Sequence, residues 1–400
     1  MDQNQLKKEI VDTLAQQNGL LFAEPAIVHR VTYSGRDILA KNSRFEKGYV
    51  DERGYVPVEW WIMSMTQAGN AVKKKGEGIT KIQLSDGTSL ALTQARELCE
   101  QELFGSFVPH WPLTKILDIG GAKVKTSFGT EEVPPIPPHV HFGEIVGGKA
   151  TKVGKKEAYF LPPLDVAPYN KTQAELGKVV TRLGLKPTVT TQQFLAALKS
   201  FGKDDAMYTL LNEYEAQAYD CWTIQPGIVH APGPWLTFEI QKPQDDYNLC
   251  GWKLGMRLAG KEHEKEHQEQ CLRGLQDEEA FLKEVVNWQA SVDPKFDEQH
   301  YRQAKVLEQG DWGRRLQIFF DGFYGEALEV KPKKMYTRQA TEKPYAGVVW
   351  SGTGELNDQE VDCENKLRKE FLVTPNTLLF VNNMKSNHPL LIYTVFPIGE

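Results

Sequence analysis

The chain has 400 residues, of which 40% are hydrophobic and 25% charged, and its formal net charge is −6. This length favours two or three packed units, and the negative charge gives no sequence-wide attraction to nucleic acid or to an acidic membrane. No apolar run is long enough to span a bilayer, and the charged N-terminus lacks the apolar core of a secretory signal. We therefore expect a globular protein that binds neither nucleic acid nor membrane.

Five cysteines are scattered along the chain without CxxC spacing, at Cys99, Cys221, Cys250, Cys271 and Cys363. An odd number without paired spacing argues against a disulfide framework and against a thiolate metal site. The cysteines therefore predict a reducing compartment, the cytoplasm.

In chain order, the first half alternates between helical and strand-like patterns. Apolar spacing predicts a helix over 4–17 and another over 90–104. Between them, AIVHRVTYSG and GYVPVEWWIMSM are short apolar runs bounded by Gly, Asn and Asp, which is typical of strands and turns. The stretch WPLTKILDIGGAKVKTSF is again β-rich.

The second half repeats this alternation. Residues 171–218 are predicted to be helical, and DCWTIQPGIVHAPGPWLTFEIQ then returns to strands. A polar helical segment at 261–314 is followed by strand-like sequence to residue 400. We expect a mainly β fold with α insertions, built on two antiparallel β-barrels. The expected division is 1–24 as an N-terminal helix, 25–170 with 219–260 as the first barrel, 171–218 and 261–314 as helical segments, and 315–400 as the second barrel.

The stretch PPHVHFGEIVGGKATKVGKKEAYF carries a candidate metal site. In a strand, His139 and His141 point to the same face, and Glu157 begins the next apolar run. His230 lies in PGIVHAPG, after a predicted tight turn. Three imidazoles and one carboxylate suit Zn, Fe, Mn, Ni or Co. Glu144 is nearer to His141 in sequence and competes with Glu157 for the carboxylate position.

A second histidine pair has a different interpretation. His263 and His267 are four residues apart in EHEKEHQEQ and share a face if this segment is helical. The segment is very polar, so we expect a solvated helix rather than a site.

The motifs and their order resemble the cupins, and more narrowly the type I mannose-6-phosphate isomerases. The similarity runs almost end to end, through EWWIMSM, ELFG, WPLTKILDIG, HVHF, KKEAYF and QPGIVHAPGPWLTFEIQ. The resemblance implies a bicupin of jelly-roll barrels whose second barrel is degenerate, and a metal held by His139, His141, Glu157 and His230. The first ligand departs from the family, which has glutamine there.

The resemblance also implies catalytic roles for Lys155, Glu239 and Asp245. A second departure follows them, because QDDYNLCGW puts Asn248 where the family has an arginine. A guanidinium suits phosphate and enolate charge, whereas an amide is neutral. Candidate substrate contacts are therefore Asn248, Lys253 and Arg257, and a non-phosphorylated sugar is as well suited to the site as mannose 6-phosphate.

Together these features predict a metal-dependent aldose–ketose isomerase of a sugar or sugar phosphate, with a substrate that differs from mannose 6-phosphate. We expect one divalent metal, zinc first, with Fe, Ni, Co or Mn as alternatives. The expected partner is a small carbohydrate, bound by a monomer or homodimer. Two other classes stay open: an Fe-, Ni- or Mn-dependent cupin oxygenase, and a non-catalytic carbohydrate-binding bicupin.

Overall fold

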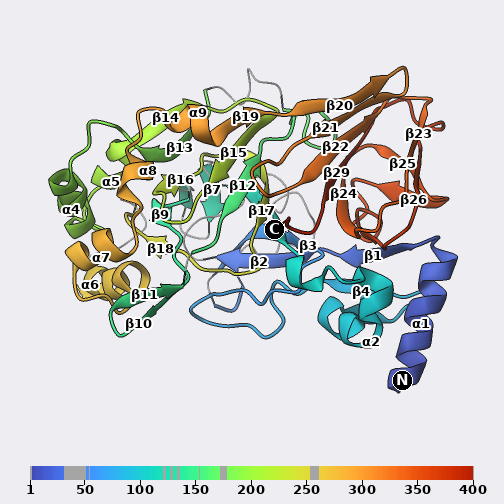
Figure 1. Ribbon diagram of the computed structural model, residues 1–400, viewed down its shortest axis with the longest axis horizontal. Coiled ribbons are helices and arrows are strands. Elements are labelled where there is room, and N and C mark those ends of the chain that lie inside the picture. Colours follow the sequence, from blue (N-terminus) through green and yellow to red (C-terminus); the bar gives the residue numbers. More distant parts are fainter. Residues whose placement is uncertain are drawn as a thin grey trace.

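The computed structural model describes residues 2–30, 51–53, 55–119, 123–126, 129–132, 136–152, 154–171, 178–252 and 261–399. It consists mainly of antiparallel strands with helical insertions, which confirms the predicted fold class. Two groups of sheets lie side by side along the long axis of the molecule (Figure 1). No helix in the described ranges is long and apolar enough to cross a membrane. Two predicted substrate contacts, Lys253 and Arg257, lie outside the described residues.

The first group of sheets carries the predicted site. Within the described residues, one sheet has the order β19-β15-β12-β17-β6-β3-β2, with bounds Tyr301–Gln303, Asp220–Ile224, Glu157–Phe160, Leu236–Gln241, Leu113–Asp118, Val56–Ile62 and Ala26–Arg30. The other has the order β14-β13-β16-β9-β18, with bounds Leu211–Glu215, Val180–Leu185, His230–Ala231, His139–Val140 and Asn248–Leu249. The two sheets pack face to face, because Val58 and Leu117 of the first share a core cluster with Leu183 of the second.

The second group joins C-terminal strands to strands from the N-terminal part of the chain. Its larger sheet has the order β20-β21-β22-β29-β24-β27-β1-β4-β5, with bounds Lys305–Gly310, Gly313–Gln317, Gly325–Val330, Leu390–Val395, Tyr345–Ser351, Glu370–Val373, Leu20–Glu24, Lys81–Gln83 and Ser89–Ala91. Its smaller sheet is β23-β28-β25-β26, with bounds Met335–Arg338, Leu379–Asn382, Thr353–Leu356 and Gln359–Asp362. Only Pro25 separates β1 from β2, so the two groups are linked at this point. Among the residues that the structure describes, two further pairs of strands form hairpins, β7-β8 (Lys123–Thr126, Gly129–Glu132) and β10-β11 (Glu144–Val146, Lys149–Lys152).

Both helices predicted in the first hundred residues are present. Helix α1 (Gln3–Gln16) begins at a capping box in which Asp2 and Gln5 exchange side-chain and backbone hydrogen bonds, and it buries Leu6 and Ile10. Helix α2 spans Leu92–Phe104. In the described ranges, the other helical elements are a 3-10 turn at Val108–His110, α4 (Thr191–Lys199), α5 (Ala206–Leu210), α6 (Lys261–Glu266), a π-helix at His267–Leu272, α7 (Glu278–Glu284), α8 (Trp288–Ser291) and α9 (Phe296–His300).

The prediction of helix throughout 171–218 is wrong for two segments. Val180–Leu185 and Leu211–Glu215 are the strands β13 and β14, which pair with each other, and β13 also pairs with β16. A strand between two partners gains backbone hydrogen bonds along both edges, and this tertiary pairing outweighs a weak local preference for helix. Only α4 and the short α5 are helical among the described residues of this segment.

The predicted helical segment 261–314 also needs two corrections. The helices end at His300, and β19 and β20 follow, with β21 beginning at Gly313. The histidine pair is not on a solvated face, because His263 is 7% exposed and its ring stacks on Phe201. His267 also contacts the Phe201 ring. An aromatic side chain on the preceding insertion therefore covers the imidazoles. The division into five segments as a whole stays a prediction.

One buried carboxyl links the two groups of sheets. Glu370 of β27 accepts hydrogen bonds from the indole Nε1 of Trp60 on β3, at 2.6 Å, and from the backbone N–H of Met63, at 2.7 Å. Burial raises the pKa of Glu370 from 4.5 to about 8. Between these pH values the folded protein holds this proton more tightly than the unfolded chain does, so stability falls as pH rises through the window.

We therefore expect the free energy of unfolding of the wild type, measured relative to that of Glu370→Gln, to decrease from about pH 5 to about pH 8, by a few kcal/mol at most. A glutamine side chain at this position cannot ionise, so the cost of burying it is the same at every pH. Urea denaturation at several pH values measures the difference. The control is Glu360→Ala on the exposed side of β26. Parallel curves for the wild type and Glu370→Gln would contradict the assignment.

Candidate metal centre

One face of the sheet that contains β12 carries the carboxylates of the site. Strand alternation puts every second residue on the same face. On β12, Glu157 and Tyr159 line a cavity between the sheets, while Phe160 points into the core shared with the C-terminal sheet. The register places Glu239 of β17 opposite Tyr159, and Lys115 of β6 opposite Glu239. The cavity therefore has a row of charged side chains along its wall.

Two short strands of the facing sheet bring the imidazoles to this row. His139 begins β9, His230 begins β16, and the two are cross-strand partners. His141 follows His139 by two residues, and the three ring centroids lie between 4.1 and 5.0 Å apart. The turn before His230 needs Gly227, which has a φ of 81° and whose Cβ would lie 2.8 Å from the backbone nitrogen of Asn287.

Each imidazole is held by a hydrogen bond from Nδ1 to a backbone carbonyl. His139 donates to the carbonyl of Pro137 at 2.8 Å, and His230 donates to that of Ile228 at 2.8 Å. His141 donates to the carbonyl of Asp246 at 2.6 Å. Because a carbonyl can only accept, all three rings carry their proton on Nδ1, and the lone pair of each Nε2 is left for another partner.

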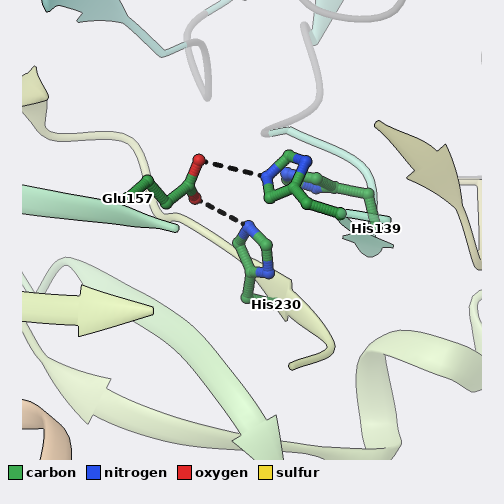
Figure 2. A group of neighbouring side chains, drawn as sticks. His139, Glu157 and His230 are labelled. Atoms are coloured by element: carbon green, nitrogen blue, oxygen red, sulfur yellow. Dashed lines mark ion pairs between the residues drawn. The ribbon is translucent and has the colours of Figure 1, made fainter. Parts of the chain in front are cut away.

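The Nε2 lone pairs of His141 and His230 face the carboxylate of Glu157, as Figure 2 shows for His230. The separations are 3.1 Å to His141 and 3.0 Å to His230, and both Nε2 atoms are buried without a hydrogen-bond donor. Acceptors that face each other at this distance repel unless a cation lies between them. The candidate ligand atoms of the four residues all lie within 4.8 Å of one another. Three neutral imidazoles and a carboxylate are a donor set that fits a divalent metal.

The protonation states agree with this fit. Burial lowers the pKa of His141 to about 3 and that of His139 well below its ordinary value, so both rings are neutral at pH 7. Burial alone would raise the pKa of Glu157, but the charged ammonium of Lys155 helps to hold it well below its ordinary range. Metal ligands must be neutral imidazole and ionised carboxylate, which are the forms present here.

The three residues predicted as catalytic all line the same cavity. Lys155 lies with its Nζ 3.0 Å from Glu157 and 3.7 Å from Glu239, and it also donates to Gln241. Burial opposes its charge, but Glu157 and Glu239 raise the pKa of Lys155 above its ordinary value. Burial, with Glu157 nearby, raises the pKa of Glu239 to about 8.

Asp245 differs from the other two because its oxygens are already engaged. It accepts from the guanidinium of Arg30 at 3.0 Å, from Lys115 at 3.4 Å and from the backbone N–H of Gly69 at 2.7 Å. Burial would raise the pKa of Asp245, but Arg30 and Lys115 keep it below its ordinary value. The geometry makes Asp245 an anchored anion.

Two other predicted residues lie away from the cavity that Lys155 lines. The side-chain amide of Asn248 donates to the carbonyl of Cys271 at 3.2 Å, on the π-helix, and Asn248 is not among the residues that line the cavity. Glu144 is exposed on β10 and lies outside the four-residue cluster. The carboxylate beside the imidazoles is therefore Glu157.

Sequence reasoning missed several residues of the cavity wall, among them Arg30, Glu59, Lys115 and Tyr159. Glu59 and Lys115 are charged residues inside apolar strands, VPVEWWI and LTKILD, and both are buried. A charge in such a strand requires a buried partner, so this pattern is a usable signal. Tyr159 donates its hydroxyl hydrogen bond to Glu157. No sequence signal marked it.

A second cluster of possible ligands lies at the edge of the same sheet, formed by His29, Asp51 and Glu77. The guanidinium of Arg53 lies 2.7 Å from both carboxylates. Because this cation already neutralises the two acids, the second cluster carries no metal proposal.

No protein-family model and no curated protein matches the sequence. Solved structures do match it over nearly its whole length. A candidate mannosephosphate isomerase from Archaeoglobus fulgidus matches with a TM-score of 0.59 at 16% identity, over 95% of this chain and 98% of that one. The mannose 6-phosphate isomerase from Bacillus subtilis matches with a TM-score of 0.57 at 15% identity, over 94% and 99%. The chain has the mannose-6-phosphate isomerase fold.

A zinc-bound mannose 6-phosphate isomerase shares this fold with a TM-score of 0.51 at 11% identity, covering 95% of this chain and all of that one. The match confirms the resemblance inferred from the order of the motifs. At identities this low, the structural match establishes the mannose-6-phosphate isomerase fold and not the activity. The activity depends on the residues of the site.

Proposed function

We propose that the protein is a metal-dependent aldose–ketose isomerase whose substrate is a sugar or a related polyhydroxy compound. The observation that carries the proposal is the group of four buried ligands at one wall of a cavity that Lys155 and Glu239 also line. Support comes from the full-length match to mannose-6-phosphate isomerases, one of which is zinc-bound. His139, His141, Glu157 and His230 would hold the metal, and zinc is the proposed ion.

Aldose–ketose isomerisation moves a proton between two neighbouring carbons through a cis-enediol of the substrate. A bound divalent ion would polarise the carbonyl and hydroxyl oxygens of the sugar. Lys155 and Glu239 stand beside each other on the cavity wall, 3.7 Å apart, and are the groups placed to hold and move the proton. Asp245 stays ionised because it pairs with Arg30 and Lys115, and it holds these two side chains in place along the cavity wall.

The proposed substrate is uncharged at the end far from the reacting carbons. Asn248, at the family's arginine position, turns to Cys271 instead of the cavity. In the described part of the wall, Arg30, Lys115 and Lys155 each contact a carboxylate. A phosphate dianion would have to compete with these buried carboxylates for the same cations, at a high electrostatic cost. These observations support a non-phosphorylated sugar.

The test is deuterium exchange in D₂O, followed by NMR, with a panel of aldoses and ketoses in free and phosphorylated forms. The proposal expects incorporation of deuterium at the carbon next to the carbonyl, together with aldose–ketose interconversion, for at least one free sugar. The control is His141→Ala, which removes a ligand and is expected to be inactive. No exchange with any sugar in zinc-loaded protein would contradict an isomerase and leave a carbohydrate-binding bicupin.

The set of four ligands also supports a second candidate function, a metal-dependent oxygenase. His139 in place of the family's amide gives three imidazoles and one carboxylate, which also suits iron in an oxygenase. Iron in the purified protein together with oxygen uptake would support this class, and zinc without oxygen uptake would exclude it.

A further inference from the structure

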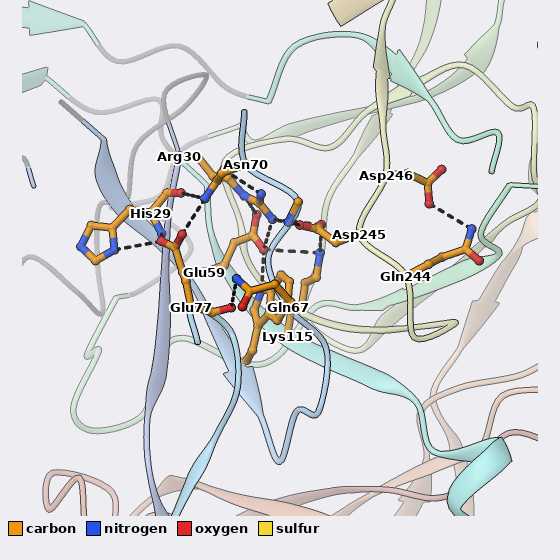
Figure 3. Close-up of polar contacts among 12 residues, drawn as sticks. His29, Arg30, Glu59, Gln67, Asn70, Glu77, Lys115, Gln244, Asp245 and Asp246 are labelled. Atoms are coloured by element: carbon orange, nitrogen blue, oxygen red, sulfur yellow. Dashed lines mark hydrogen bonds and ion pairs between the residues drawn. The ribbon is translucent and has the colours of Figure 1, made fainter. Parts of the chain in front are cut away.

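Arg30 is the centre of a buried network beside the metal centre (Figure 3). It ends β2, and 2% of its side chain is exposed. Its Nε donates to Glu59 at 2.7 Å and its Nη2 to the second oxygen of Glu59 at 3.1 Å. Nη2 also lies 3.0 Å from both oxygens of Asp245, and Nη1 donates to Asn70 at 3.0 Å. The guanidinium thus joins the sheet wall to the segment that carries Asp245.

That segment, residues 242–247, connects β17 to β18 and also contacts the site through its backbone. The residue after Asp245 supplies the carbonyl that accepts from Nδ1 of His141, at 2.6 Å. Gly69 holds Asp245 from the other side through its N–H. Arg30 therefore anchors the segment one residue away from the carbonyl that orients a proposed metal ligand.

The dependence on this segment is particular to His141. His139 and His230 each donate to the carbonyl two residues earlier in their own strand entry, so their orientation is set locally. His141 donates to a residue 105 positions away. Displacement of 242–247 would therefore change the orientation of one imidazole out of three.

We propose that Arg30 is a positioning residue for the metal ligand His141, acting through Asp245 and the carbonyl of Asp246. This inference rests on the proposed metal site and assigns Arg30 no contact with the reacting atoms. The role requires arginine, because its planar fork reaches Glu59, Asp245 and Asn70 together, whereas the single ammonium of lysine does not.

The experiment is a Co²⁺ titration of demetallated full-length wild type and Arg30→Lys, followed by visible absorption and checked against a competing chelator. A lysine side chain keeps the buried positive charge but lacks the planar set of donors of the guanidinium. Loss of a group that orients a ligand costs about 10–100-fold in metal affinity. Because Arg30 acts on His141 only through another residue, Arg30→Lys is expected to weaken Co²⁺ binding about 10-fold and to change the d–d spectrum of the bound ion. Both are measured at a temperature at which the variant is folded.

Arg338→Lys is the matched control. Arg338 of β23 is also a buried arginine, and its guanidinium lies 2.9 Å from the carboxylate of Glu326 in the C-terminal group of sheets. Arg338→Lys is expected to lower thermal stability while leaving Co²⁺ affinity and spectrum at wild-type values. A general loss of stability would affect both variants alike, so the comparison separates positioning from stability.

Gly69→Ala tests the same segment without changing a charge, and it serves if Arg30→Lys fails to fold. A Cβ at Gly69 would lie 2.4 Å from the carbonyl oxygen of Asp245, so the segment has to move. We expect weaker Co²⁺ binding here as well. Wild-type affinity and spectrum in a folded Arg30→Lys or Gly69→Ala protein would overturn the positioning role. A wild type that binds no Co²⁺ would overturn the metal site and this role with it.

Discussion

His230→Ala is expected to yield purified protein without bound metal, whereas the wild type carries about one divalent ion per chain. The His230 side chain is fully buried, and its Nε2 faces Glu157 at 3.0 Å. Losing a direct ligand should cost more than the roughly 100-fold that loss of an outer-shell partner can cost. Turnover should fall to background for the same reason. Elemental analysis of protein purified without chelator measures the metal.

His388→Ala is the control for this variant, because His388 is exposed on the C-terminal group of sheets. It should keep the metal and the activity of the wild type. Retention of about one ion in His230→Ala, with unchanged affinity, would show that His230 is not a ligand.

Lys155→Met is expected to keep the metal and to lose about 10²–10⁴-fold in kcat, the contribution that a positioned proton carrier makes. Lys155 lies between Glu157 and Glu239 on the cavity wall, so its ammonium is placed to contact a substrate bound at the proposed metal. Steady-state kinetics on the sugar identified by deuterium exchange, with metal content measured in the same sample, gives the result.

The neighbouring Lys156 supplies a matched control. It donates to the carbonyl of Asp321 and does not line the cavity, so Lys156→Met should keep kcat near the wild-type value. Equal losses in the two variants would contradict a specific role for Lys155. Loss of metal in Lys155→Met alone would make the lysine a partner of Glu157 rather than a proton carrier.

The ligand set was predictable because strand geometry is regular. His139 and His141 are two residues apart, a spacing that predicts one common face; β9 ends at Val140, and both rings still reach the same wall, while Glu157 begins a fully buried strand. Glu144 is nearer to His141 along the chain and was a competing candidate for the carboxylate position. It failed because β10 belongs to an exposed hairpin, a fact that depends on tertiary packing.

Other parts of the fold depend on contacts that local sequence does not encode. VTRLGL became β13 because β14 and β16 flank it, and β14 comes from a segment with its own helical pattern. Arg30 gave no signal as a member of the site, since its partners Glu59 and Asp245 lie 29 and 215 residues away. Charges inside apolar strands, such as Lys115 in LTKILD, were the one overlooked pattern that predicts a buried network.

The central claim is that four buried side chains form one metal site, and metal analysis of wild type and His141→Ala in parallel tests it most directly. The account predicts about one divalent ion per chain in the wild type, with zinc as the proposed ion, and its loss in His141→Ala. A wild type that contains no metal and takes none up on incubation with zinc would contradict the site and the isomerase proposed from it.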